Sequence, residues 1–311
     1  LVNMMFYMPT ISLAITVSYS AMNKANMDVV KDYPPIRVWG TVGFIVAMWT
    51  VSLLKIETSP LQFYVASLAA VILGIYAFTL PKCEVNNNTD KKSLVDVLGL
   101  RAFTLFKQWK MALFFIFSML LGAALQLTNA YGDTFLHDFA TVDAYKDLIA
   151  IKYPAIIMSI SQMSETLFIL TIPFFLRKFG IKNVMLFSMI AWVLRFGLFG
   201  LGNPAENLWM IILSCIVYGM AFDFFNISGS LYVETQTDHS IRASAQGVFM
   251  MMTNGFGAVF GSMTAGWLID RFFTVDGVKQ WQGIWFTFAA YALVVAVLFA
   301  VSFRHKHDPK Q

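Results

Sequence analysis

Two carboxylic acids, Glu165 and Asp223, each lie inside a long apolar run of this sequence. An ionised carboxylate at the centre of a bilayer costs at least about 2.5 kcal/mol on insertion scales. A chain that retains two such groups is expected to face them toward water, a partner group or a cargo. The sequence therefore predicts a polytopic membrane protein that moves a polar solute, with a protonatable group inside its pathway.

Further polar and aromatic side chains recur at helical spacing in the apolar runs, so that each group shares one face of its helix. Paired amides offer both donors and acceptors to a cargo, and aromatic faces beside an acid suit a flat ligand that forms hydrogen bonds. The candidate substrate-binding residues are Arg37, Thr41, Phe44, Gln126, Asn129, Gln162, Glu165, Tyr218 and Phe222. The candidate proton-coupling residues are Asp223 and Glu165.

These groups also have structural explanations that the sequence leaves open. Arg37 suits an anchor at the cytoplasmic interface, and Gln126 with Asn129 suits hydrogen bonding between helices. Tyr218 and Phe222 would by themselves indicate packing. The GxxxG spacing of Gly257 and Gly261 usually means close helix contact.

Arg195 lies in the middle of an apolar run and needs a counter-charge there. Either Glu165 or Asp223 could supply it, and the sequence does not choose between them. A structural ion pair and a role in coupling are both compatible with this position.

Composition assigns the chain to the membrane class. Of its 311 residues 58% are hydrophobic and only 13% are charged, and the mean hydropathy is +0.65. Soluble proteins average about 25% charged residues, so lipid is expected to cover much of this chain. The net charge of +4 is spread without long basic runs, which argues against a nucleic-acid partner.

Catalytic and metal motifs are missing from the sequence. It holds two cysteines and four histidines, none arranged as a metal cluster, and it has no P-loop, HExxH or GxSxG motif. We therefore expect a secondary transporter rather than an enzyme, with no cofactor and no metal.

Nine spans are predicted at about 20 apolar residues per crossing. They cover residues 1–22, 36–54, 62–80, 111–130, 154–176, 183–200, 207–227, 244–269 and 281–303. Apart from Arg195, the loops carry 16 Lys and Arg on one side and 5 on the other, so the richer side and the C-terminus are predicted to be cytoplasmic. The first residue is then placed outside, and an odd number of further helices upstream would resolve that placement.

The longest connection, residues 81–110, includes an amphipathic stretch at 93–106. It divides the chain into four predicted parts. These are 1–80, the remaining half of an N-terminal bundle; 81–110, a cytoplasmic linker; 111–303, a six-helix bundle; and 304–311, a cytoplasmic tail. Two six-helix bundles joined by a long linker are a common transporter architecture.

Several segments closely resemble the bacterial nucleoside permeases, the nucleoside–proton symporters of the major facilitator superfamily. They are YPPIRVWGTVGFIVAMW, FFIFSMLLGAALQLTNAYGDTFLH, SISQMSETLFILTIPFF, VYGMAFDFFNISGS and IRASAQGVFMMMTNGFG. The resemblance implies an all-α fold of twelve helices, of which this chain would hold the fourth to the twelfth. It also implies that the candidate residues above line a cavity between two bundles.

The function implied by this resemblance is proton-coupled nucleoside uptake across the bacterial inner membrane by alternating access, by a monomer. Asp223 is the expected coupling acid and Glu165 chiefly a ribose ligand, although the two roles could be exchanged. A symporter of the same fold for a sugar or other polar metabolite is the nearest alternative. A membrane-embedded enzyme and a non-transporting receptor are more distant ones.

Overall fold

The computed structural model describes residues 29–57, 59–80, 100–141, 145, 147–238 and 241–305, together with scattered positions among the first 27. Side chains at 29–35, 37, 141 and 243 are outside this description. The chain divides into two compact units, Leu1–Lys91 and Lys92–Gln311. The predicted span at 1–22 and most of the predicted linker therefore fall outside the described residues.

The first unit contains two described apolar helices, α2 (Val29–Leu53) and α3 (Leu61–Ala77). Helix α2 begins at Val29, seven residues before the predicted span at 36–54. None of the side chains of α3 is buried, which is the exposure expected of a helix that faces lipid.

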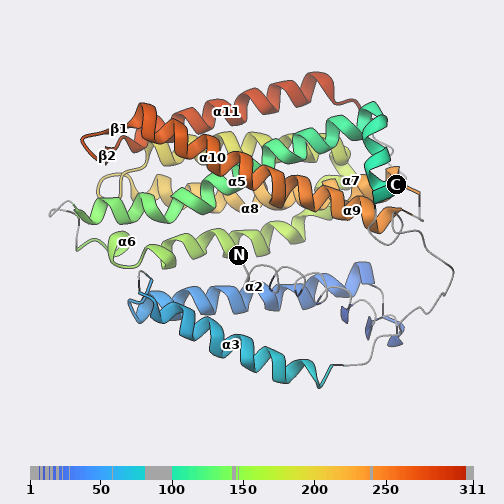
Figure 1. The fold of residues 1–311 in the computed structure, drawn as a ribbon, viewed down its shortest axis with the longest axis horizontal. Helices are drawn as coiled ribbons and strands as arrows, with labels where there is room; N and C mark the ends of the chain where they lie inside the picture. Colours follow the sequence, from blue (N-terminus) through green and yellow to red (C-terminus); the bar gives the residue numbers. More distant parts are fainter. Residues whose placement is uncertain are drawn as a thin grey trace. The chain divides into compact units, whose positions relative to one another are not determined.

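The second unit is built from long helices with short connections (Figure 1). Its main elements are η1 (Leu100–Lys107), α5 (Trp109–Asp138), α7 (Pro154–Leu201), α8 (Leu208–Gln236), α9 (Arg242–Met250), η4 (Met251–Gly257), α10 (Ala258–Leu268), η5 (Ile269–Phe273) and α11 (Trp281–Ser302). The shorter ones are η2 (Phe139–Thr141), α6 (Ile149–Lys152), and the paired strands β1 (Thr274–Val275) and β2 (Val278–Lys279). The described end of the predicted amphipathic stretch is the 3₁₀ helix η1.

The long element α7 is a helical hairpin rather than one straight rod. A straight helix would separate Ser161 from Arg195 by about 50 Å at 1.5 Å per residue. Instead Nη1 of Arg195 lies 3.5 Å from Oγ of Ser161. The reversal occurs at Gly180, whose φ of 76° and ψ of 165° suit glycine and not residues with a side chain. The two predicted spans at 154–176 and 183–200 are the two arms of this hairpin.

Close backbone contact joins α5 to the segment formed by η4 and α10. A Cβ atom at Gly122 would lie 2.0 Å from the carbonyl oxygen of Thr253, and one at Gly257 would lie 2.5 Å from that of Met119. A Cβ at Gly261 would similarly meet Ala123 at 2.8 Å. The GxxxG spacing thus serves helix packing, as small residues commonly do in membranes.

The other long helices complete the bundle. Helix α8 packs along α7, and α11 packs against α7 and α5. Aromatic side chains fill the core between them, with Trp285 stacked on Phe199 at a centroid distance of 4.8 Å. Lys182 donates a hydrogen bond to the carbonyl oxygen of Ala300 at 3.1 Å, which links the turn of α7 to the end of α11.

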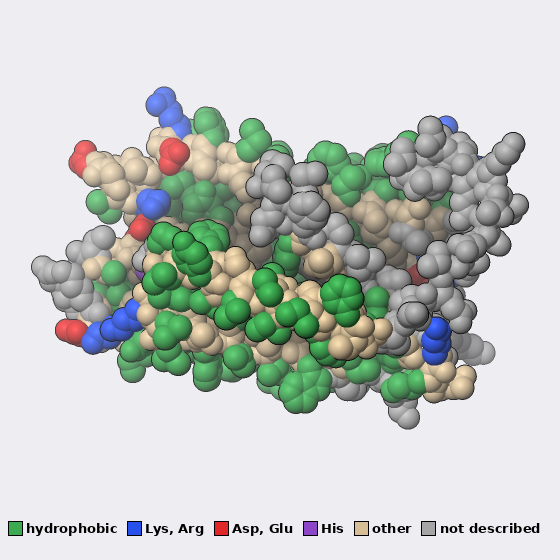
Figure 2. All heavy atoms as spheres, turned by 60° about the horizontal axis from the view of Figure 1, so that its bottom comes forward, with side chains coloured by type: hydrophobic (Ala, Val, Ile, Leu, Met, Phe, Trp, Pro, Cys, Tyr) green, Lys and Arg blue, Asp and Glu red, His purple; other side chains and the backbone are tan. Residues whose placement is uncertain are grey.

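The surface of the described helices agrees with a membrane environment. Four helices, Trp109–Asp138, Pro154–Leu201, Leu208–Gln236 and Trp281–Ser302, are long and apolar enough to span a bilayer. On the face drawn in Figure 2, hydrophobic side chains cover much of the helices and charged ones gather toward the ends. The predicted span at 244–269 is observed as α9, η4, α10 and η5, a continuous helical segment with two π-helical stretches.

Candidate functional site

Tight contact between α7 and α8 positions the two buried acids. Gly219 lies directly against the backbone at Ser164, where an added Cβ would be 2.6 Å from the carbonyl carbon. The Ser164 hydroxyl donates a hydrogen bond to the carbonyl oxygen of Ile216 in α8. Glu165 follows Ser164 in the chain, and Asp223 lies one turn after Gly219. The helix contact therefore fixes the backbone positions from which the two acidic side chains extend.

Tyr218 connects the candidate residues of α7 with those of α8. Its hydroxyl lies close to the Gln162 side chain and within electrostatic range of Glu165 and Asp223. Its ring stacks on Phe222 with centroids 5.7 Å apart and an interplanar angle of 4°. The structure thus brings together the five candidates predicted on these two helices.

Burial of the two acids is nearly complete. Glu165 is 8% exposed and Asp223 is 1% exposed, whereas Phe222 is partly buried. Moving an ion from water to a low-dielectric interior favours its neutral form. A change in protonation at either acid would therefore alter the free energy of this part of the bundle substantially.

Arg195 is the main functional candidate that lay outside the predicted site. It is 1% exposed, and its Nη1 donates a hydrogen bond to the carbonyl oxygen of Ser214 at 2.8 Å. Its Cζ lies 4.4 Å from the centroid of the Tyr218 ring. Within the described residues, the expected ion pair with Glu165 or Asp223 is not among its contacts. The signal in the sequence was a single arginine in mid-span, which did not specify carbonyl and aromatic partners.

A small hollow of about 20 Å³ lies beside the cluster, between α5, α7, α8 and η4. Its wall is mostly apolar, and Asn226 and Thr253 add polar side chains. It is lined by Leu121, Gly122, Leu125, Trp192, Ala221, Phe222, Phe225, Asn226 and Thr253. At that size the hollow holds about one water molecule and is far below the roughly 300 Å³ of a small-molecule pocket. Phe222 belongs to both the Tyr218 cluster and this hollow.

The remaining predicted residues lie on α5 and α2. Gln126 is half-buried on α5 and Asn129 is exposed there. In the first unit, Thr41 is half-buried and Phe44 is 53% exposed on α2. The side chain of Arg37 lies outside the described part of the chain. Because the two units are described separately, a role for these residues in one common site remains a prediction.

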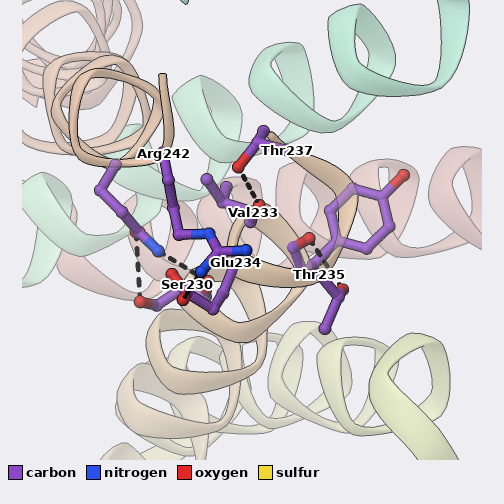
Figure 3. Close-up of polar contacts among 8 residues, drawn as sticks. Ser230, Val233, Glu234, Thr235, Thr237 and Arg242 are labelled. Atoms are coloured by element: carbon purple, nitrogen blue, oxygen red, sulfur yellow. Dashed lines mark hydrogen bonds and ion pairs between the residues drawn. The ribbon is translucent and has the colours of Figure 1, made fainter. Parts of the chain in front are cut away.

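A second polar cluster joins the end of α8 to the start of α9 (Figure 3). Glu234 and Arg242 form a salt bridge at 2.7 Å, and Gln246 donates a hydrogen bond to the carbonyl oxygen of Ser230 at 2.8 Å. Both charged side chains are partly exposed, so the pair contributes little to stability and chiefly fixes the connection. Metal-binding groups of three or more His, Cys, Asp or Glu are absent from the described residues.

Comparison with known proteins assigns the family. A profile described as "Nucleoside H+ symporter" matches residues 1–308. The chain belongs to the nucleoside H+ symporter family. It is accordingly a transporter and not an enzyme, as the sequence predicted.

Relatives of this symporter are named permeases. It is 57% identical over 312 residues to the xanthosine permease of Escherichia coli K12, covering 100% of this chain and 74% of that protein. It is 51% identical over 308 residues to nucleoside permease NupG of the same organism, covering 99% of this chain and 73% of the permease. A crystal structure of the D323A mutant of nucleoside transporter NupG superposes with a TM-score of 0.88 at 51% identity, covering 96% of this chain and 74% of that one.

Proposed function

We propose that this symporter carries nucleosides inward with protons by alternating access, and that the cluster around Tyr218 forms part of its transport site. Family membership supports the reaction class. The observation that carries the site assignment is the convergence of an amide, two acids and the stacked ring of Phe222 on Tyr218. A nucleoside presents ribose hydroxyl groups and a flat base, and these are the groups that such a set can bind.

The ligand roles follow from the chemistry of each side chain. The Gln162 amide can both donate hydrogen bonds to ribose hydroxyls and accept them, and the Glu165 carboxylate can accept them. The stacked rings of Tyr218 and Phe222 provide an apolar wall against the base. The relatives named for xanthosine and for nucleosides in general make a purine and a pyrimidine nucleoside the natural test substrates.

Asp223 is assigned the proton. With 1% exposure it is the more deeply buried acid, so its charge has the larger desolvation cost. Uptake of a proton from the outer side neutralises it and lowers the cost of enclosing the site. A difference in protonation free energy between the outward and inward states then biases the transition between them.

The same proposal includes the placement of the protein. Nine spans equivalent to the fourth to twelfth helices of a twelve-helix fold would cross the inner membrane, with the C-terminus in the cytoplasm. Support for this orientation comes from the distribution of Lys and Arg among the loops. Arg37, Thr41, Phe44, Gln126 and Asn129 would supply further substrate-binding side chains, and the working unit would be a monomer.

Uptake by proteoliposomes tests the proposal. The full-length protein is reconstituted with an inward proton gradient, and accumulation of labelled uridine and xanthosine is measured. Asp223→Asn should abolish uphill accumulation while leaving measurable nucleoside binding. Asp147→Asn is the matched control, because Asp147 is 94% exposed. Undiminished proton-driven accumulation by Asp223→Asn would refute the assignment of the proton to Asp223.

The sugar alternative is tested in the same vesicles. Adenosine in excess should suppress uptake of labelled uridine, whereas a disaccharide at the same concentration should leave it unchanged. Absence of any nucleoside uptake by the wild-type protein, together with uptake of a sugar, would overturn the proposed substrate class.

A further inference from the structure

The face of the Tyr218 ring is covered by a buried cation. Cζ of Arg195 lies 4.4 Å from the centroid of that ring and 5.0 Å from the centroid of the Phe199 ring. A guanidinium within about 6 Å of an aromatic centroid is attracted by the ring quadrupole, most strongly where water is excluded. Arg195 is 1% exposed and Tyr218 is 6% exposed, so water is excluded from this contact.

Three helical segments besides its own hold the guanidinium in place. Its Nη1 donates to the carbonyl oxygen of Ser214 at 2.8 Å and lies 3.5 Å from Oγ of Ser161. Its Nε lies 3.4 Å from Oγ1 of Thr128. Arg195 itself lies on the second arm of α7, while these partners lie on α8, the first arm of α7 and α5. The cation is therefore fixed by several elements and is not free to follow Tyr218.

Tyr218 in turn has little freedom. Phe222 stacks on it with centroids 5.7 Å apart, and Trp192 contacts it edge-on at 6.0 Å and 89°. The Arg195 guanidinium is a third neighbour of the Tyr218 ring, and its own hydrogen bonds tie it to the other helices. Because the Tyr218 hydroxyl lies close to the side chains of Gln162 and Glu165, the position of the ring limits where those ligand groups can lie.

We propose that Arg195 is a positioning residue for transport, which holds Tyr218 against Phe222 through its cation–π contact and so sets the geometry of the nucleoside-binding wall without touching the nucleoside. This inference rests on the proposed function of the Tyr218 cluster. It accounts for an arginine retained at bilayer depth, where a charged side chain is costly. It also accounts for the choice of arginine, since a planar guanidinium can stack on a ring while it donates in its own plane.

The kinetic test compares Arg195→Gln and Arg195→Lys in the reconstituted full-length protein. Loss of the positioned ring should raise the KM for uridine by about tenfold in Arg195→Gln, while the maximal rate per folded transporter is largely retained. Arg195→Lys keeps the charge and should recover part of the affinity. Ser214→Ala is the matched control: it removes the hydroxyl bond to the Arg195 carbonyl but leaves the Ser214 carbonyl and the guanidinium contact, so its KM should be unchanged.

A double-mutant cycle with Tyr218→Leu gives the decisive readout. If Arg195 acts through Tyr218, adding Arg195→Gln to Tyr218→Leu should change uridine affinity by no more than about twofold. A purely structural arginine would lower the maximal rate and the melting temperature equally in both backgrounds, with KM unchanged. The inference would be overturned by that pattern of rate and melting temperature. It would also be overturned if the Arg195 and Tyr218 substitutions changed uridine affinity independently, or if neither Arg195 variant folded. Absence of nucleoside binding by the wild type in the same preparation would instead overturn the proposed function.

Discussion

Replacing Gly219 by alanine would place a methyl group against the backbone of α7. The added Cβ would lie 2.6 Å from the Ser164 carbonyl carbon, 2.7 Å from the Ser164 oxygen and 2.7 Å from the Glu165 nitrogen. Carbon atoms in contact are normally about 3.5–4.0 Å apart. The backbones of α7 and α8 must therefore separate by about 1 Å to admit the methyl group, since none of the three atoms belongs to a side chain that can turn away.

The expected cost has a stability part and a functional part. Overpacking of a close contact destabilises by about 1–3 kcal/mol, so the melting temperature of the purified protein should fall by several degrees. Separation of the helices also moves Glu165 away from Tyr218 and Asp223. Displacements of about 1 Å in a reacting geometry can cost about 100-fold in rate, and we expect nucleoside uptake to fall by at least about tenfold.

Gly197→Ala is the control for this experiment. It is the same substitution inside α7, but an added Cβ there meets no atom within 4 Å. Alanine is the better helix former by up to about 1 kcal/mol, so this variant should be as stable as the wild type or more so. Both variants are measured by thermal unfolding in detergent and by uridine uptake. Wild-type stability and uptake in Gly219→Ala would refute the argument that backbone contact sets the distance between the acids.

The remaining predictions concern the site and the region around β1 and β2. Glu165→Gln should weaken uridine binding by at least about tenfold, since charged hydrogen bonds contribute about 1.5–3 kcal/mol, and equilibrium binding with an unchanged Kd would contradict its role as a ligand. Asp138 accepts a hydrogen bond from Lys279 at 2.9 Å, and both side chains are partly exposed. Asp138→Asn should therefore lower the free energy of unfolding by less than about 1 kcal/mol and leave KM unaltered. A larger loss of stability in thermal unfolding would contradict this prediction. Gly277 has a φ of +78°, so Gly277→Ala should lower stability by about 1–2 kcal/mol, whereas an unchanged melting temperature would show that the turn can relax.

The periodicity of the apolar runs was enough to predict most of the helical elements. Predicted spans at 154–176, 207–227 and 281–303 correspond to the first arm of α7, to α8 and to α11. Helix ends were less predictable, and α8 continues to Gln236. Its last turns contain polar residues that a count of apolar residues excludes, and they are held by contacts with α9 such as the salt bridge of Glu234.

Arg195 shows where reasoning from the sequence failed. An arginine in mid-span required a partner, and a carboxylate was the natural expectation because opposite charges attract. The observed partners are a backbone carbonyl, hydroxyl groups and aromatic rings, which any helix of this chain could have supplied. Which carbonyl and which ring depends on how four helical segments meet, and no pattern within one segment contains that information.

The sequence alone indicated that this protein lies in a membrane and singled out Glu165 and Asp223 as its candidate functional acids. It also placed Gln162 on the helical face of Glu165, and Tyr218 and Phe222 together on one face next to Asp223. Those conclusions follow from the cost of charge in lipid and from helical periodicity, which are properties of single segments. Only the tertiary structure decided that α7 reverses at Gly180. It also decided that the backbone of α7 at Ser164 packs directly against Gly219 of α8. The convergence on Tyr218 follows from these contacts, because side chains on separate helices meet only where packing brings the helices together.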